Sequence, residues 1–526
     1  MLQTPRPIMK RRIYNILFHT HTISGIIISV ALYVIFFAGS LSFFRDEIAN
    51  WEQNSHTQFT DHLPADIDAY LKTISETHPL QGREVEFTHY YNEPSFTVNI
   101  SVSADTLALK ELQQPSFFYL NANDYTTSTY LDNYGLGEFL YRLHFLDQIP
   151  YPYGRYLSGF VALFFLFALF TGIWIHWDKI VSNFYTFRPL AKLKTVWTDA
   201  HTALGLIGFP FQFVYALTGA FFLLKGILML PLVYGLYGGD QNKLYEDLEY
   251  SHPHFDYTYT PLNYSPKINP LIEKTLADWP DFQLTEVHIF NHGDANMHVS
   301  LSGNTTYSKK FSGYGYRIYK VADQSITHQK VPKTNNTYLD GAKTILYRLH
   351  LGDYGGLALR FISFILGLIS CVVIIPGILI WLVARNKKNI PEKRRRFNHW
   401  VANSYMAICL SMLPVTALTF IVTKIYGVER SLIFKTYFIS WLLLSLFFTF
   451  KRNIYFTNKW CFVTGGILSL VVPFTNWLST GNWPWISVAN QCREILFIDL
   501  LFLGIGLIAS WVGVFKIKFQ SKIINT

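Results

Sequence analysis

The sequence predicts a membrane all-α helical bundle of about eight transmembrane helices, internally duplicated, that carries two small α+β domains outside the membrane. Three observations lead to this fold class. Hydrophobic residues make up 50% and charged residues only 15% of the 526 residues, which is too apolar for an ordinary soluble protein. Eight apolar runs reach the length of about 20 residues that crosses a bilayer. Two long polar segments between these runs resemble each other in the order of their expected elements.

The apolar runs also predict the orientation of the chain. The predicted spans lie at 23–44, 156–177, 203–234, 357–384, 400–424, 431–450, 460–479 and 494–515. Lysine and arginine cluster before the first span and after the second, fourth, sixth and eighth, so the positive-inside rule places both termini in the cytoplasm. The net charge of +9 follows from this pattern. Because no base-reading motif accompanies it, we expect no nucleic-acid partner.

Spans and polar segments alternate along the chain. The predicted parts are the cytoplasmic N-terminus with the first span (1–44), a first outer domain (45–140), spans two and three with a cytoplasmic loop (141–235), a second outer domain (236–346), span four (347–385) and four additional C-terminal spans (400–516). In each outer domain a helix, at 66–78 or 269–278, precedes alternating strands. The last four spans carry few polar residues, and their role is open.

An internal repeat relates the first four spans. The repeated positions are His21 and His201, Gly25 and Gly205, Gly39 and Gly219, and the sequence YRLH at 141–144 and 347–350. A glycine follows each YRLH helix about one span later, at Gly172 and Gly377. One unit is therefore helix, outer domain, helix, and the chain contains two such units.

Histidines near the ends of the spans are the predicted functional residues. His21, His176 and His201 are expected at the cytoplasmic ends of spans one, two and three, and His144 and His350 at the outer ends of spans two and four. An ionisable side chain at such a position needs a partner or a ligand. Neutral imidazole is a good axial ligand of haem iron, and no CxxCH motif occurs, so two non-covalent b-type haems are predicted.

The outer ligands are the symmetric pair His144 and His350, beside which Arg142 and Arg348 could meet the haem propionates. At the inner face the choice is open. His21 and His201 are related by the repeat, whereas the position equivalent to His176 is occupied by Trp381.

Other chemistry finds less support in the sequence. Non-haem metals would need carboxylate or cysteine neighbours at ligand spacing, of which the spans supply almost none. Proton relays and transporters usually add buried carboxylates, and the spans are expected to lack these. Three histidines of the second outer domain, His288, His292 and His298, could form a metal or substrate patch. Strand alternation would place them partly on different faces of a small sheet, however, so we expect them to face solvent.

Several motifs resemble those of a known family. They are His21–Gly25 (HTISG), Ala38–Ser42 with Phe44–Glu47 and Trp51, Thr171–His176 (TGIWIH), Phe184–Pro189 (FYTFRP), Asp199–His201, Pro210–Phe211, Thr218–Gly219 and Tyr347–His350. On these residues the chain resembles the PepSY-associated transmembrane family over about 15–385. The chain departs from the family pattern after His21, where an aromatic residue often follows, and His19 offers a competing ligand.

The resemblance implies PepSY-like periplasmic domains and a bacterial inner-membrane reductase with two b haems. Such a reductase reduces ferric iron in periplasmic siderophore or other ferric chelate complexes and releases Fe(II). No GxGxxG motif is present, so the electron donor is expected to be external, either a quinol or a cytoplasmic reductase. Two other functions stay open: a non-redox, membrane-anchored PepSY protein that binds or regulates a partner, and a transporter of iron or siderophores.

Overall fold

The computed structural model describes residues 11–54, 63, 66–89, 95–122, 124–250, 253–305, 313–332, 334 and 337–517. Within these residues, eight helices are long and apolar enough to cross a membrane. They are α1 (Arg11–Ser42), α5 (Tyr153–Ile175), α7 (Leu193–Leu236), α11 (Gly356–Arg385), α12 (Glu392–Tyr426), α13 (Arg430–Lys451), α14 (Ile454–Thr480) and α16 (Arg493–Trp511). Each overlaps one predicted span, so the prediction of a multi-pass helical membrane protein is confirmed.

The chain divides into two compact units. The helical unit comprises residues 1–56, 134–229 and 360–526, and the sheet unit comprises 57–133 and 230–359. These boundaries differ from all four limits of the predicted outer domains, which were 45–140 and 236–346. The short helices α2 (Arg45–Gln53) and α4 (Leu136–His144) belong to the helical unit and pack against each other, although both segments were predicted to lie wholly or partly in the first outer domain.

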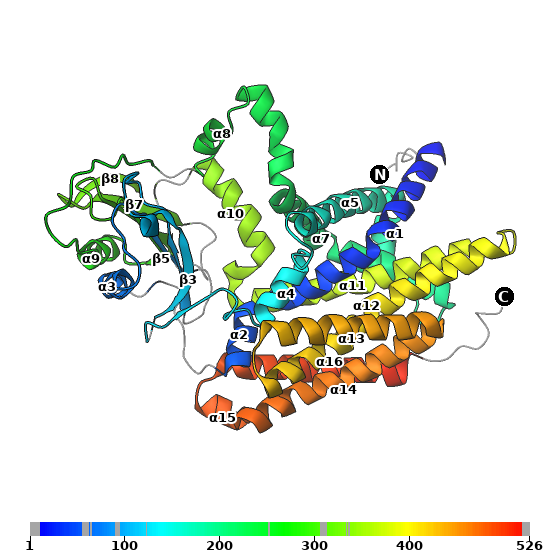
Figure 1. The fold of residues 1–526 in the computed structure, drawn as a ribbon. Coiled ribbons are helices and arrows are strands. Elements are labelled where there is room, and N and C mark those ends of the chain that lie inside the picture. The colour runs from blue at the N-terminus through cyan, green and yellow to red at the C-terminus, as the bar shows by residue number, and fades with distance from the viewer. Residues whose placement is uncertain are drawn as a thin grey trace. The chain divides into compact units, whose positions relative to one another are not determined.

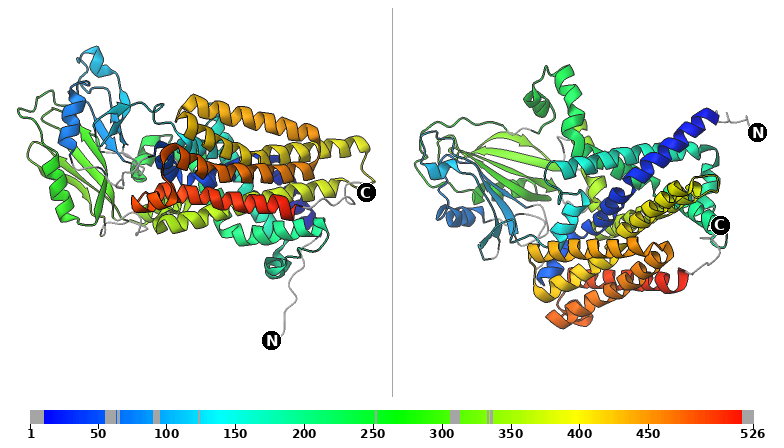
Figure 2. Two further views of the ribbon diagram at one scale, coloured as in Figure 1. Left: turned by 90° about the horizontal axis from the view of Figure 1, so that it is seen from below. Right: turned by 45° about the vertical axis from the view of Figure 1, so that its right-hand side comes forward.

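The last four spans form a bundle within the helical unit. Figure 1 and Figure 2 show α12, α13, α14 and α16 running alongside one another, with the short α15 (Pro484–Ala489) before α16. Small residues permit close approach, since a Cβ at Gly466 of α14 would lie 2.6 Å from the Ser510 nitrogen. The expectation that the spans lack buried carboxylates is wrong, because Asp499 of α16 is fully buried. A single carboxylate in an apolar run barely changes its hydropathy.

The sheet unit contains one antiparallel sheet. Its strands are β1 (Val85–Thr88), β2 (Ser95–Ile100), β3 (Ser116–Asn121), β4 (Thr127–Ser128), β5 (Phe282–Phe290), β6 (His298–Thr305), β7 (Tyr314–Lys320) and β8 (Ser325–Lys330). The order is β4-β3-β2-β1-β5-β6-β7-β8. The sequence predicts two separate domains, whereas the structure joins both polar segments in this sheet. Pairing of β1 with β5 removes an exposed edge strand from each half.

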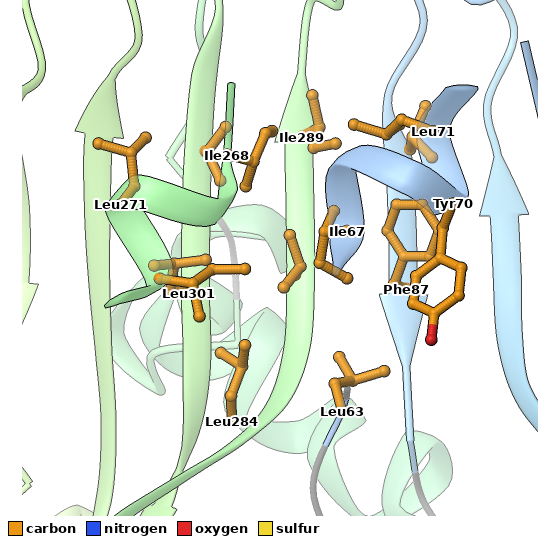
Figure 3. Packing of buried hydrophobic residues seen from close by; sticks show 14 of the residues in the cluster. Leu63, Ile67, Tyr70, Leu71, Phe87, Ile268, Leu271, Leu284, Ile289 and Leu301 are labelled. Carbon is orange, nitrogen blue, oxygen red and sulfur yellow. The ribbon is translucent and has the colours of Figure 1, made fainter. Parts of the chain in front are cut away.

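Helices α3 (Ile67–Ser75) and α9 (Asn269–Asp278) cover one face of the sheet over a shared core. Figure 3 shows Ile67 and Tyr70 of the first half in one cluster with Ile268 and Ile289 of the second. The N-terminal ends of α3 and α9 are also hydrogen-bonded to each other. The Asp68 carboxylate accepts the backbone N–H of Ile268 at 2.7 Å, and the Asn269 side chain donates to Asp66 at 2.9 Å. The two halves therefore fold as one body.

His288 and His298 of the second half lie on the face of the sheet opposite α3 and α9. His298 pairs with Phe290 across β5 and β6, so His288, Phe290 and His298 share one side. His288 and His298 are buried, and the ring of Phe255 stacks on His298 at 3.8 Å. The expectation of solvent-facing histidines is therefore wrong for both, because the segment around Phe255 covers this part of the sheet.

Candidate functional site

A cavity of about 320 Å³ lies among α1, α5, α7 and α11 of the helical unit. We call it the four-helix cavity. Its walls are mostly aliphatic and aromatic, and His21, His176 and His201 all line it. Of the described residues that line it, Arg385 alone carries a formal charge. The structure therefore brings together all three histidines predicted for the inner face.

His21 and His201 are held in the same way by equivalent helices of the repeat. The His21 Nδ1 atom lies 2.9 Å from the Ala168 carbonyl oxygen of α5, and the His201 Nδ1 atom lies 2.9 Å from the Val373 carbonyl oxygen of α11. A glycine follows each of these carbonyl residues four positions later, and the histidine ring packs against it. A Cβ at Gly172 would lie 3.1 Å from the Cε1 atom of His21.

The ring of His201 packs equally closely on Gly377, where a Cβ would lie 3.2 Å from the Cε1 atom of His201. Because a carbonyl oxygen can only accept, Nδ1 carries the proton in both rings and Nε2 keeps its lone pair. A metal-ligating histidine typically donates its second nitrogen to such a carbonyl. Both rings are thus prepared to bind a metal through Nε2.

The spacing of these two rings matches a shared axial site. Their centroids are 6.1 Å apart and their planes lie at 75° to each other. Two imidazoles that bind one metal ion through Nε2, each at about 2.0 Å, place their ring centres roughly 6 Å apart. Two neutral imidazoles in an apolar cavity between helices therefore fit the donor set of a bis-histidine haem.

His176 and His19 fit the ligand role less well. His176 caps α5, and its Nδ1 atom accepts the Asn183 side-chain N–H at 3.2 Å, which leaves the ring proton on Nε2. His19 is exposed on α1 and does not line the cavity. The hydrogen bonds thus favour the pair related by the repeat among the alternatives that the sequence leaves open.

His144 is held in the same way, by a carbonyl oxygen and a glycine, towards the other end of α1. It is the last residue of α4, and its Nδ1 atom lies 2.8 Å from the Ile35 carbonyl oxygen. Its ring packs on Gly39, four residues further, where a Cβ would lie 2.7 Å from its Cε1 atom. Burial lowers the pKa of His144, which favours the neutral imidazole.

The two histidine sites are well separated along α1. Ile35 follows His21 by fourteen residues, which corresponds to about 21 Å of helix. This distance lies within a hydrocarbon core of about 30 Å.

The sequence predicts that each YRLH sequence lies at the end of a spanning helix. The structure shows that this prediction is wrong for both. The first ends α4, before α5 begins at Tyr153, and the second ends α10 (Tyr338–Leu351) in the sheet unit, where Gly352 at φ +65° stops the helix. His350 therefore belongs to the sheet unit, whereas His144 belongs to the helical unit. The pairing of the two histidines stays a prediction from the repeat.

The two YRLH arginines are paired with aspartates of the chain. Arg142 donates hydrogen bonds to Glu138 at 2.6 Å and to Asp147 at 2.7 Å, and Arg348 forms an ion pair with Asp353 at 3.0 Å. Against the effect of burial, hydrogen bonds from Arg155 and Arg142 hold the pKa of Asp147 below its usual value. The motif is thus YRLHxxD in both repeats, a regularity visible in the sequence. A propionate would meet these arginines beside their aspartates, and this role stays a prediction.

Comparison with known proteins places the chain in a family. Residues 18–384 match the family described as PepSY-associated TM region. The chain belongs to this family. Its helical unit supplies both histidine sites from within the matched range, while α12 to α16 lie beyond it. A protein of Pseudomonas aeruginosa, named Uncharacterized protein PA4219, is 21% identical over 287 residues, which cover 53% of this chain and 71% of that protein.

Proposed function

We propose that this PepSY-associated membrane protein is a b-type di-haem reductase that carries electrons across the bacterial inner membrane to ferric iron. Its substrate would be a ferric siderophore or another ferric chelate in the periplasm, and Fe(II) would be released. The observation that supports this proposal best is the His21–His201 pair, with ring centres 6.1 Å apart in an apolar cavity and each Nδ1 held at a carbonyl.

The four-helix cavity would hold the first haem. His21 and His201 would hold it, Gly172 and Gly377 leave room for their rings, and most of the residues that line the cavity are apolar. Arg385, whose guanidinium lies 4.9 Å from the centre of the Trp381 ring, brings the positive charge that a propionate requires. When bound, the haem supplies one-electron redox chemistry that the side chains of this chain lack.

His144 would ligate the second haem, with His350 as the partner predicted by the repeat. With both termini in the cytoplasm, the four-helix cavity faces the cytoplasmic side and His144 the periplasmic side. An external donor, a quinol or a cytoplasmic reductase, would deliver electrons at the first site. Each electron that leaves the second site converts one Fe(III) to Fe(II), which hard oxygen ligands bind more weakly, so the chelator survives and the iron leaves.

Stopped-flow mixing of the dithionite-reduced protein, freed of excess dithionite, with a ferric siderophore tests this reaction. We expect both haems to reoxidise, with one Fe(II) captured by a colorimetric ferrous chelator for each electron lost. The matched control is the gallium(III) complex of the same siderophore, which has the same charge and shape but accepts no electron. Haems that stay reduced in the presence of several ferric chelates would contradict the proposal.

A further inference from the structure

We infer that the C-terminal bundle, which lies beyond the family match, positions the helix that carries His144. The inference rests on the proposed function, because it assigns the bundle a role in holding the second haem ligand. It concerns α12 to α16, for which neither the repeat nor the histidine pattern predicts a role. Three sets of contacts within the helical unit carry it.

The first set joins α4 directly to α13. Phe139 of α4 is fully buried, five residues before His144. Its ring centre lies 5.3 Å from that of Phe434, 4.9 Å from Tyr437 and 5.9 Å from Phe438, all on α13. Buried aromatic pairs of this kind contribute stability beyond the burial of their area. One face of α4 is therefore fixed by the bundle.

The second set joins α4 to α2. The Glu52 carboxylate of α2 accepts the backbone N–H of Leu136 at 2.6 Å, at the first residue of α4. Arg45, at the start of α2, donates to Glu138 at 3.0 Å. A carboxylate at a helix N-terminus satisfies a free N–H group and interacts favourably with the helix dipole. These two bonds therefore fix the N-terminal end of α4 to α2.

The third set joins α2 to the bundle through Asp499 of α16. This buried carboxylate accepts the indole N–H of Trp51 of α2 at 2.8 Å. From α14 it accepts the Asn476 amide at 2.9 Å and the Trp477 indole at 2.8 Å. The Lys424 ammonium of α12 lies 4.5 Å from the centre of the Trp51 ring. Hydrogen bonds to a buried charge are among the stronger ones in proteins, so α2 is firmly held.

Together these contacts hold α4 through α13 and α2, in addition to the contact of His144 with the Ile35 carbonyl oxygen of α1. A metal ligand must be held within about 0.5 Å of its productive position to work well. Asp499, Trp51 and Phe139 are therefore positioning residues for His144. Of the described residues, those that line the four-helix cavity all come from outside the bundle. The bundle also packs against α11, where Ala402 of α12 contacts Ile378 and Leu382, but Trp51, Phe139 and Asp499 lie outside that cluster. We therefore expect the first haem not to depend on Trp51, Phe139 and Asp499.

A matched pair of substitutions tests this role. Trp51→Phe and Trp477→Phe each remove one indole N–H bonded to Asp499 at 2.8 Å, but only Trp51 lies on α2. We expect Trp51→Phe to shift the midpoint potential and the low-spin electron paramagnetic resonance signal of the second haem, and to lower its occupancy severalfold. The first haem should be unchanged, and Trp477→Phe should leave both haems like the parent protein.

Hydrogen–deuterium exchange of residues 136–144 gives a second readout that needs no haem. Trp51→Phe should raise exchange in α4 well above the Trp477→Phe variant. Equal effects of the two variants, or equal effects on both haems, would show a general packing role and overturn the inference. A parent protein without haem would contradict the proposed function. The exchange comparison would still decide whether the contacts of Trp51 and Asp499 position α4.

Discussion

Replacing His21 or His201 by alanine is expected to remove one haem per chain and leave the other. Each ring contributes one Nε2 atom to the same site, with its Nδ1 held by a carbonyl of the facing helix. Loss of either ring would remove one of the two residues that would hold the haem, and none of the described residues that line this apolar cavity is a carboxylate that could replace it. A pyridine haemochrome assay on the purified variants should therefore give about half the haem of the parent protein, because only the site near His144 stays filled.

His19→Ala is the matched control, since His19 lies two residues from His21 on the same helix but is exposed. It should keep the full haem content. The ligand assignment would be wrong if His176→Ala removed a haem while His201→Ala retained it. That result would make His176, whose Nδ1 accepts from Asn183, the second axial ligand.

Gly39→Ala is expected to remove the second haem while the protein stays folded. An alanine Cβ at this position would lie 2.7 Å from the Cε1 atom of His144, closer than atoms can pack, so the ring must leave its seat and its bond to Ile35. Alanine itself favours a helix over glycine by about 1 kcal/mol, so α1 should not be weakened by its own propensity. Haem content and the spectrum of the remaining haem measure the effect.

Gly226→Ala provides the comparison, because a Cβ at Gly226 of α7 meets nothing within 4 Å. This variant should match the parent protein in haem content. Full haem content in Gly39→Ala, with the parent spectrum, would show that His144 does not hold a haem from this seat.

Much of the helical unit follows from local sequence patterns. Each span is an uninterrupted apolar run, and hydropathy depends only on neighbouring residues, so all eight were predicted in place. The joined sheet was not predicted, because the pairing of Val85 with Ile289 links residues about two hundred positions apart. Periodicity identifies a strand but does not identify its partner. The duplication offers a hint, since two equivalent edge strands can pair about a two-fold axis.

The candidate site divides in the same way. Histidines in apolar helices are conspicuous in a sequence because burial of an ionisable group is costly. The choice among His21, His176 and His201 depends on partners such as the Ala168 carbonyl, which no side-chain pattern reveals. The glycines at 172 and 377 were visible as repeated positions, but their use as seats for the rings appears only in three dimensions. Asp499 was missed because its donors come from two other helices.

The haem content of the purified parent protein tests the central claim most directly. The protein would be expressed in a host able to supply haem, purified in detergent, and examined by oxidised and reduced visible spectra with a pyridine haemochrome assay. The account predicts a low-spin b-type spectrum and close to two haems per chain. Protein that is folded but free of haem would contradict it, and would leave the sheet unit as the functional part of a non-redox membrane protein.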